Sequence, residues 1–370
     1  MSEPSPLIQQ CEHVFEVAER KLRRLVTAHP DFFPMYTDGG RWMHAKAAWT
    51  NWCEGFLGGQ LWLLYQHTGD PYWREKAEHY SRLVEHRKTD RNVHDLGFLF
   101  FSTWKRWYDL TGDPALNEVI IEAGKTLALR FKEKGQYLRS FFGEDSLFID
   151  IMMNVGIIFY AARETGDADL WRIADAHCRT TRKYLVRGDG STAHEGIFDL
   201  QTGEFLHQST QQGYRNDSSW ARGLAWSLYG FGTVYSYTGN PAYLQTAEAN
   251  ANCYIERTGE NGVPPNDWDD PAPKTPYESS AAAIAASGML NLARLTGDPA
   301  RARLYRDYAH RILHTLASPA FLAEEEAWEG ILKHGIYHNH LDLGVDESVA
   351  WGDYFFLEAV SKVLQEARHG

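Results

Sequence analysis

The chain has 370 residues, and 37 Lys and Arg against 49 Asp and Glu give it a formal net charge of −12 at pH 7. This excess of negative charge argues against nucleic acid and an anionic membrane as partners, because both attract basic proteins. The four cysteines form no Cys-x-x-Cys pair, which argues against a disulfide framework and a structural zinc site. No apolar run reaches the roughly 18 residues that span a bilayer, and the N-terminal residues lack a signal-peptide pattern. We therefore expect a cytoplasmic protein, a monomer or a weak homodimer.

Aromatic side chains are frequent, with 13 Trp, 19 Tyr and 18 Phe. We expect most of them in the core. The abundance of tryptophan also suits a sugar-binding cleft, because flat rings stack on pyranose faces while their edges donate hydrogen bonds.

The first predicted element is an amphipathic helix over residues 7–27. After it, a turn with the pattern Thr-Gly-Asp-Pro or a close variant recurs five times, starting at Thr68, Thr111, Thr165, Thr238 and Thr296. Its glycine can adopt the left-handed conformation that ends a helix. Asp or Asn then caps the next helix, and proline fits the first turn of that helix. Each copy therefore predicts the tight end of a helical hairpin.

The segments on the two sides of each turn differ in character. Those before it are apolar or rich in small residues, which predicts helices buried on most sides: 56–65, 96–110, 148–162, 221–237 and 281–295. Those after it are amphipathic, which predicts helices buried on one face: 72–86, 116–131, 170–185, 242–257 and 302–316. Residues 348–364 add a final apolar helix.

Six inner and six outer helices joined by short turns predict an all-α fold, an (α/α)6 toroid of six helical hairpins. We expect residues 1–370 to form a single catalytic domain of this kind. The turn glycines are 43, 54, 73 and 58 residues apart, which is irregular for the alternative, an open solenoid. If the tight turns share one rim, the longer polar connections gather at the other. The mouth formed there is where we expect a small-molecule site.

Two carboxyl groups stand out near the predicted starts of the inner helices. Asp150 lies within the apolar stretch 147–154, where loss of solvent should raise its pKa and keep it protonated near neutral pH, as a general acid requires. A core aspartate paired with an arginine is the alternative interpretation. Asp95 begins the preceding inner helix, so the toroid places it beside Asp150. The two residues together predict an acid–base pair of the kind that glycosidases use.

Metal binding has weaker support. His334, His338 and His340 are close in sequence but lie in a glycine-flanked loop, and no His-Glu-x-x-His or Cys/His set is present. A Gly-x-Ser-x-Gly nucleophile elbow is also missing. We therefore expect neither a metal site nor a cofactor.

Several sequence strings point to a family. They include His94-Asp95-Leu96-Gly97-Phe98, Ser219-Trp220-Ala221-Arg222-Gly223-Leu224-Ala225-Trp226, Trp351-Gly352-Asp353-Tyr354 and shorter elements around Trp52, Asp150, His194 and Gln212. Over nearly its whole length the chain resembles the unsaturated glucuronyl hydrolases of glycoside hydrolase family 88. It is more distantly similar to the unsaturated rhamnogalacturonyl hydrolases. The resemblance implies a six-hairpin α/α barrel, in agreement with the fold predicted from the turns.

The resemblance also implies a reaction. Its substrates would be oligosaccharides with a 4,5-unsaturated uronic acid at the non-reducing end, the product that polysaccharide lyases leave. Hydration of the vinyl ether would release this uronic acid. Asp150 would protonate carbon 4 and then, as a carboxylate, accept a proton from water. Asp95 would hold ring hydroxyls and keep Asp150 protonated through its like charge.

The residues with an implied substrate-binding role are His94, His194, Gln212, Trp52, Trp220, Arg222 and Trp226. The histidines and the glutamine would hydrogen-bond substrate or water. Arg222 would bind the uronate carboxylate through two hydrogen bonds. The tryptophans would form stacking walls, with simple packing as the alternative for Trp226.

The chain departs from the expected family pattern at three places. Phe141-Phe142 stands where relatives often carry a tryptophan, and Glu278 stands where many carry an aspartate before Ser-Ser-Ala. The loop 337–343 lacks the Ser and Lys cluster associated with sulfated sugars, and it contains Asp342, which would repel sulfate. We therefore expect a preference for unsulfated disaccharides.

Other functions remain open at this point. An unsaturated rhamnogalacturonyl hydrolase is a near alternative. A sugar 2-epimerase on the same toroid would need two histidines on facing inner helices, whereas the best-placed acid–base residues are Asp95 and Asp150. A sugar-binding protein without catalysis would keep the aromatic residues but would give no reason for a carboxyl group at position 150.

Overall fold

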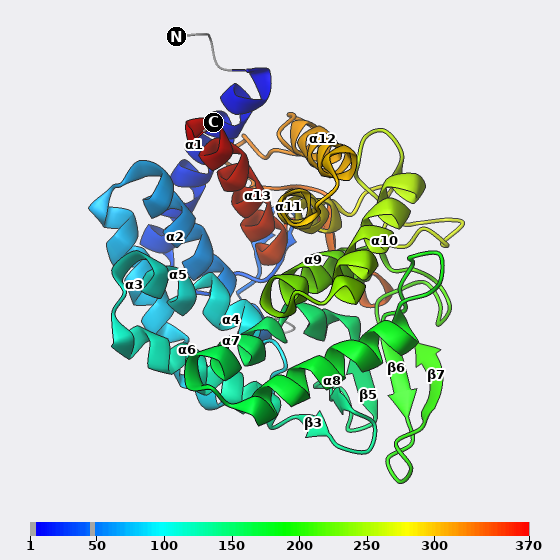
Figure 1. The fold of residues 1–370 in the computed structure, drawn as a ribbon. Helices are drawn as coiled ribbons and strands as arrows, with labels where there is room; N and C mark the ends of the chain where they lie inside the picture. The colour runs from blue at the N-terminus through cyan, green and yellow to red at the C-terminus, as the bar shows by residue number, and fades with distance from the viewer. Residues whose placement is uncertain (1–4, 45–48, 370) are drawn as a thin grey trace.

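The computed structural model describes residues 5–44 and 49–369, and most of them are helical (Figure 1). The first four residues, which are part of the N-terminal segment that lacks a signal-peptide pattern, lie outside the described residues. Among the helices of the described residues, none has the length and apolar character needed to cross a membrane.

An inner ring of helices surrounds the centre of the molecule (Figure 1). Its members are α2 (Gly55–Thr68), α4 (Leu96–Ser102) with its continuation α5 (Trp104–Thr111), α7 (Gly156–Thr165), α9 (Ala221–Thr238), α11 (Ser279–Leu295) and α13 (Ala350–His369). Each member packs against the next, and α13 packs against α2, so the ring is closed. This closure confirms the predicted (α/α)6 toroid over an open solenoid.

A second layer of helices covers the ring. Its members are α1 (Pro6–Ala28), α3 (Pro71–Leu83), α6 (Pro114–Ala128), α8 (Ala168–Leu185), α10 (Pro241–Thr258) and α12 (Pro299–Leu316), and each packs against an inner helix. Outer helix α12 buries Tyr305, Ala309, Ile312 and Leu316, which are three or four residues apart and lie on one face. Inner helix α11 is buried at almost every position, as its small and apolar residues predict.

Four of the five predicted turns form as expected. Gly69, Gly112, Gly166 and Gly239 have φ values of 71°, 68°, 69° and 63°, and the Asp or Asn that follows each one caps the next helix through its side chain. The fifth turn differs, because α11 ends at an extended Thr296. The turn threonine adds a bond that the sequence analysis missed. Thr68 Oγ1 donates to the Leu64 carbonyl at 2.8 Å and accepts the Asp70 N–H at 3.1 Å.

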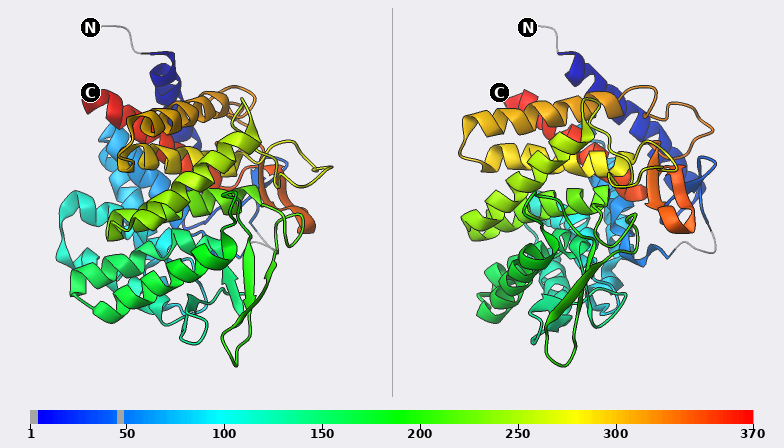
Figure 2. Two further views of the ribbon diagram at one scale, coloured as in Figure 1. Left: turned by 45° about the vertical axis from the view of Figure 1, so that its right-hand side comes forward. Right: turned by 90° about the vertical axis from the view of Figure 1, so that its right-hand side faces the viewer.

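Short strands occupy the longer connections, which the all-α prediction did not include. They form the antiparallel pairs β1 (Thr37–Asp38) with β2 (Arg41–Trp42), β3 (Phe131–Lys132) with β4 (Tyr137–Leu138), and β8 (Gly335–His338) with β9 (Leu343–Glu347). A fourth sheet has the order β5 (Ser146–Phe148), β6 (Glu195–Phe198), β7 (Phe205–Ser209). The pairs β6–β7 and β8–β9 extend from the same end of the helices (Figure 2, left).

The third inner helix begins later than predicted. Residues 148–162 were expected to be helical, but α7 starts at Gly156. Phe148 pairs with Glu195 between β5 and β6, and Ile149 N–H donates to the His194 carbonyl at 2.9 Å, so the chain is extended there. A 3-10 turn, η3 (Ile149–Met153), then leads into the helix. Asp150 therefore lies in this turn and not in an α-helix.

Helix α9 approaches η3 closely at Gly230. A Cβ built at Gly230 would lie 2.5 Å from the Met152 carbonyl oxygen, whereas one at Gly232 would meet only Leu295 Cδ1 at 3.8 Å. Helix propensity alone favours alanine over glycine by about 1 kcal/mol. We predict that Gly232→Ala raises the melting temperature slightly and that Gly230→Ala lowers it, because the second change pushes η3 away. Thermal unfolding of the two variants tests this, and equal melting temperatures would contradict it.

Candidate active site

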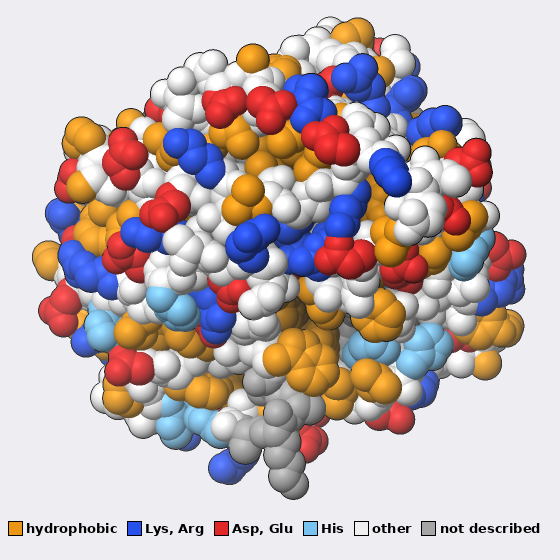
Figure 3. All heavy atoms as spheres, turned by 90° about the horizontal axis from the view of Figure 1, so that it is seen from below, with side chains coloured by type: hydrophobic (Ala, Val, Ile, Leu, Met, Phe, Trp, Pro, Cys, Tyr) orange, Lys and Arg blue, Asp and Glu red, His pale blue; other side chains and the backbone are white. Residues whose placement is uncertain are grey.

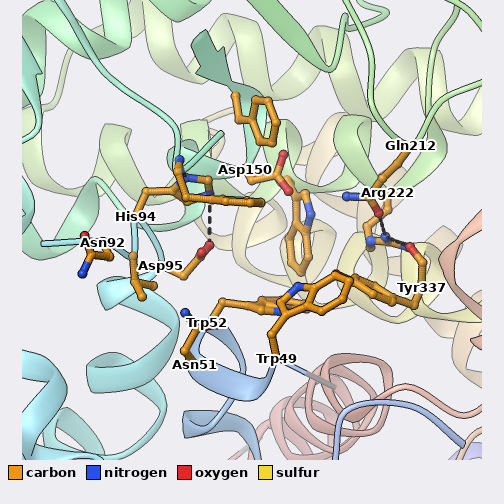
Figure 4. Close-up of a pocket in the computed structure, with 14 residues that line it drawn as sticks. Trp49, Asn51, Trp52, Asn92, His94, Asp95, Asp150, Gln212, Arg222 and Tyr337 are labelled. Carbon is orange, nitrogen blue, oxygen red and sulfur yellow. Dashed lines mark hydrogen bonds and ion pairs between the residues drawn. The ribbon is translucent and has the colours of Figure 1, made fainter. Parts of the chain in front are cut away.

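A cavity of about 340 Å³ opens at the end of the ring where the inner helices begin (Figure 4). Seen from below, the surface is hollowed between hydrophobic side chains near its lower centre (Figure 3). The cavity is lined by Trp49, Asn51, Trp52, Asn92, Val93, His94, Asp95, Phe141, Phe148, Asp150, Gln212, Arg222, Trp226 and Tyr337. These residues come from segments far apart in the chain, and six of the fourteen are Trp, Phe or Tyr. Such a lining suits a sugar ring that offers both flat apolar faces and hydroxyl edges.

The two predicted acid–base residues both line this cavity. Asp95 precedes α4 and is 4% exposed, and the Asp150 side chain in η3 is 15% exposed. Asn154 lies between them: its Nδ2 atom is 3.3 Å from Asp95 Oδ1 and 3.2 Å from the Asp150 carbonyl. Its Oδ1 atom accepts the Phe98 N–H at 2.8 Å. Asn154 thus ties the start of the second inner helix to η3.

Burial raises the pKa of both carboxyl groups. The pKa of Asp150 rises to about 7, and the nearby Arg222 guanidinium limits the rise. The pKa of Asp95 is also well above its usual range, because of burial and then the negative charge of Asp150. Desolvation is the first cause at both groups, and the like charge acts between the two carboxyl groups, so each disfavours ionisation of the other.

Each carboxyl group faces the Nε2 atom of a buried histidine. His94 Nε2 lies 3.4 Å from Asp95 Oδ1 (Figure 4), and His194 Nε2 lies 3.6 Å from Asp150 Oδ2. Burial lowers the pKa of both rings, that of His194 to about 3, so both are neutral. Backbone N–H groups donate to the two Nδ1 atoms, from Phe141 at 3.0 Å and from Gln211 at 3.1 Å. The proton of each ring is therefore on Nε2. His194 Nε2 and Asp150 Oδ2 are both buried without a hydrogen-bond partner, so the 3.6 Å between them is a close approach and not a hydrogen bond.

His194 lies behind the cavity wall, contrary to its expected place beside the substrate. The residue is 2% exposed and is not part of the lining. Its only acidic neighbour within ion-pair distance, among the described residues, is Asp150. Direct contact between His194 and substrate is therefore not supported, whereas His94 and Gln212 do line the cavity.

Arg222 lines the cavity, but protein oxygens occupy both of its terminal nitrogens. Nη1 donates to the Ile336 carbonyl at 2.5 Å, and Nη2 donates to the Tyr337 carbonyl at 2.8 Å and to Gln212 Oε1 at 2.5 Å. Glu278 Oε2 lies 3.6 Å from Nη1. The predicted two-bond contact with a substrate carboxylate would have to displace some of these bonds.

The three predicted tryptophans lie at different depths. Trp52 lines the cavity, with its ring centroid 4.7 Å from Trp351 and 6.2 Å from the stacked Tyr337. Trp226 is 1% exposed and reaches only the floor, packed on Phe98. Trp220 is wrong as a stacking wall. It is 1% exposed, is absent from the lining, and packs behind His194 at 4.6 Å with the Arg222 guanidinium 4.4 Å from its ring.

Comparison with known proteins decides the family. Residues 27–259 match the family described as Glycosyl Hydrolase Family 88. The chain is 36% identical over 324 residues to an unsaturated glucuronyl hydrolase of Formosa agariphila, which covers 84% of this chain and 80% of that protein. The chain belongs to glycoside hydrolase family 88.

Other relatives of this family 88 chain agree. It is 32% identical over 347 residues to the unsaturated glucuronyl hydrolase of Bacillus sp. (strain GL1), covering 90% of this chain and 91% of that protein. The crystal structure of an unsaturated glucuronyl hydrolase from Bacillus sp. GL1 has a TM-score of 0.89 at 30% identity and covers 97% of both chains. A solved UGL variant with dGlcA-Glc-Rha-Glc has a TM-score of 0.90 at 30% identity and covers 96% of this chain and 97% of that one.

Several lining residues of this family 88 site were missed or had no role in the sequence analysis. Asn51, Asn92 and Val93 precede the inner helices and had no role assigned to them, and Phe148 was expected at the start of an inner helix but lies on β5. Tyr337 was noted only as part of a loop. The structure places it on β8, where its carbonyl holds Arg222 and its ring stacks on Trp52.

Two departures from the family pattern have structural explanations. Glu278 is fully buried and caps α11 by accepting the Ser280 and Ala281 N–H groups at 3.2 Å and 2.9 Å. It also accepts the Ile336 N–H at 3.2 Å, so it holds β8 beside Arg222. Asp342, predicted to repel sulfate, forms an ion pair with Lys274. That ion pair partly offsets its charge and weakens the repulsion argument.

The raised pKa of Asp150 makes the stability of this family 88 protein depend on pH. Its pKa is about 7 in the folded protein and about 3.9 in an unfolded chain. Such a group stabilises the fold fully below the unfolded pKa, and this contribution is lost as pH rises through the folded pKa. Between pH 5 and pH 7.5 the wild type should lose up to about 3 kcal/mol relative to Asp150→Asn. Urea unfolding at both pH values measures this, and a pH-independent difference would contradict it.

Proposed function

We propose that the chain hydrolyses oligosaccharides ending in a 4,5-unsaturated uronic acid and releases that uronic acid. The observation that supports this proposal most directly is a buried carboxyl group, Asp150, with a pKa of about 7 at the wall of an aromatic cavity. The relatives are named unsaturated glucuronyl hydrolases and unsaturated chondroitin disaccharide hydrolases, which supports the same reaction.

In the proposed first step, the protonated Asp150 gives its proton to carbon 4 of the sugar. This carbon is the electron-rich end of a vinyl ether, so the π electrons form the new C–H bond. Positive charge then develops at carbon 5 and is shared with the ring oxygen. General acid assistance of this kind typically contributes about 10²–10⁴-fold to the rate.

In the second step, water adds to carbon 5 while the Asp150 carboxylate accepts one of its protons. The resulting hemiketal opens to a ketone at carbon 5. Carbon 1 is then a hemiacetal that expels the remaining saccharide as an alcohol. Asp150 ends protonated, as it began, and one water has been consumed.

The other lining residues hold the substrate in this proposal. Asp95 binds ring hydroxyls, and His94 and Gln212 contact the sugar or the attacking water. Trp52 provides a stacking wall, which its partial exposure beside Tyr337 supports. Arg222 contributes positive charge near the uronate and near Asp150.

The single-domain organisation of residues 1–370 is part of this proposal, and the packing of α1 against α13 supports it. A cytoplasmic location and a monomeric or weakly dimeric state stay predictions from the sequence. A size-exclusion measurement with light scattering tests the second of these.

Loss of the unsaturated chromophore tests the activity. When lyase products of chondroitin, hyaluronan, heparin, gellan or rhamnogalacturonan are added, we expect absorbance near 235 nm to decay with at least one of them.

Asp150→Asn should reduce this turnover at least about 100-fold, because the acid is lost, while substrate binding changes little. The control variant is Asp175→Asn, which makes the same chemical change on outer helix α8, where Asp175 pairs with Arg179. A folded Asp150→Asn protein that keeps a tenth of the rate would refute the general-acid role.

A preference for unsulfated sugars follows from the lining. Among the described residues that line the cavity, Arg222 is the only Lys or Arg, and its terminal nitrogens are occupied by protein oxygens. We therefore expect unsulfated chondroitin disaccharide to have a severalfold higher kcat/KM than the 6-sulfated form. Initial rates with both disaccharides test this, and faster turnover of the 6-sulfated form would show the expectation to be wrong.

A further inference from the structure

Glu195 is a buried carboxyl group next to the site that does not line the cavity. It starts β6, directly after His194, and is 1% exposed. Both of its oxygens accept hydrogen bonds, Oε1 from Ser146 Oγ at 2.5 Å and Oε2 from Gln211 Nε2 at 3.0 Å. These two partners belong to the segments that hold the two histidines of the site.

The first arm leads to His194. Gln211, bound to Glu195 through its side chain, donates its backbone N–H to His194 Nδ1 at 3.1 Å. Thr210 Oγ1 lies 3.2 Å from the same ring nitrogen. The position of the Gln211 backbone therefore sets which way His194 presents its Nε2–H to Asp150.

The second arm leads to His94. Ser146 Oγ accepts from Ser140 Oγ at 2.7 Å, and Ser140 Oγ in turn accepts the Phe142 N–H at 3.1 Å. The preceding N–H, that of Phe141, donates to His94 Nδ1 at 3.0 Å. The turn at residues 140–142 is thus held through Ser146 by the same carboxyl group.

The direction of the hydrogen bonds requires an acceptor at position 195. The Phe142 N–H can only donate, so the Ser140 hydroxyl must send its own proton to Ser146. The Ser146 hydroxyl must then send its proton to Glu195. A carboxylate accepts from Ser146 and from Gln211 at the same time. An apolar residue would leave the buried Ser146 hydroxyl without its acceptor and would release the half-buried Gln211 amide.

We propose that Glu195 is a positioning residue that orients both histidines toward the two acid–base carboxyl groups. It acts through Gln211 on His194 and through the Ser146–Ser140 pair on His94. The proposal rests on the proposed roles of Asp150 and Asp95. The new element is that Glu195, a buried residue outside the cavity, controls the orientation of the histidine next to each of these two carboxyl groups.

Glu195→Leu tests the proposal, because leucine has a similar size but accepts no hydrogen bond. We expect kcat to fall at least about tenfold with less than a threefold change in KM. The alkaline limb of the kcat/KM profile should move to higher pH, because a misplaced His194 Nε2–H no longer favours the ionised form of Asp150. Glu195→Gln should recover most of the rate, since its oxygen accepts from Ser146 and a rotated Gln211 amide can accept from its NH2 group.

The matched control is Glu248→Leu on outer helix α10. Glu248 is also buried and accepts from Thr296 Oγ1 at 2.8 Å, but it lies outside the cavity lining. We expect this variant to lose stability and keep the wild-type pH profile. A folded Glu195→Leu protein with wild-type kcat and an unmoved alkaline limb would overturn the proposal.

If Glu195→Leu does not fold, Ser146→Ala and Gln211→Leu each remove one arm. Ser146→Ala should lower kcat, and Gln211→Leu should shift the alkaline limb; unchanged profiles in both would also overturn the proposal. Ring ¹⁵N spectra of histidine report the Nε2–H tautomer without turnover. They test the positioning role even if the wild type shows no decay at 235 nm, a result that would refute the proposed function alone.

Discussion

Loss of solvent around two carboxyl groups at the open end of the helical ring is the constraint on which the rest of the site depends. Asp95 and Asp150 both line the cavity with little exposure, and burial is the main cause of the raised pKa of each. A buried charge without partners is costly, so the surroundings must supply donors for the charged form without displacing the proton. Asn154 Nδ2 donates to Asp95, and the neutral His94 and His194 rings place an Nε2–H 3.4 Å from Asp95 and 3.6 Å from Asp150, because a backbone N–H occupies each Nδ1 atom.

The ring architecture explains why this desolvated place is nonetheless accessible. The tight turns close one end of the helical pairs, and the longer connections with their short strands lie at the other (Figure 2). The connections contribute the lining residues, while close backbone contacts hold the inner helices beneath them. A Cβ on Gly97 would lie 2.6 Å from Asn154 Cα, and one on Gly230 would lie 2.5 Å from the Met152 carbonyl oxygen. These contacts keep η3, and with it Asp150, at a defined depth in the ring.

The sequence predicted the features that depend on residues close together in the chain. The hairpin turns are such a case, since a glycine, a capping side chain and a proline act within four residues. The strands are not, because β5 is three residues long and its partner β6 begins about fifty residues later. Asp95 and Asp150 could be placed at the mouth from the order of the helices. Trp220 could not, because the choice between facing the cavity and packing behind His194 depends on neighbours from other connections. The pairing of Lys274 with Asp342 was invisible for the same reason.

The position of Arg222 accounts for a carboxyl group that can both give and accept a proton. Desolvation alone would hold Asp150 protonated, which serves the first half of a hydration and blocks the second, where a carboxylate must take a proton from water. The guanidinium opposes that effect and leaves the pKa of Asp150 at about 7. At neutral pH the acid and base forms of this carboxyl group are then both populated. Arg222 can hold this place without collapsing onto Asp150, because Gln212, Ile336 and Tyr337 bind its terminal nitrogens. The bonds that make Arg222 a poor free ligand for a substrate carboxylate are thus the ones that keep its charge at a fixed distance from the acid.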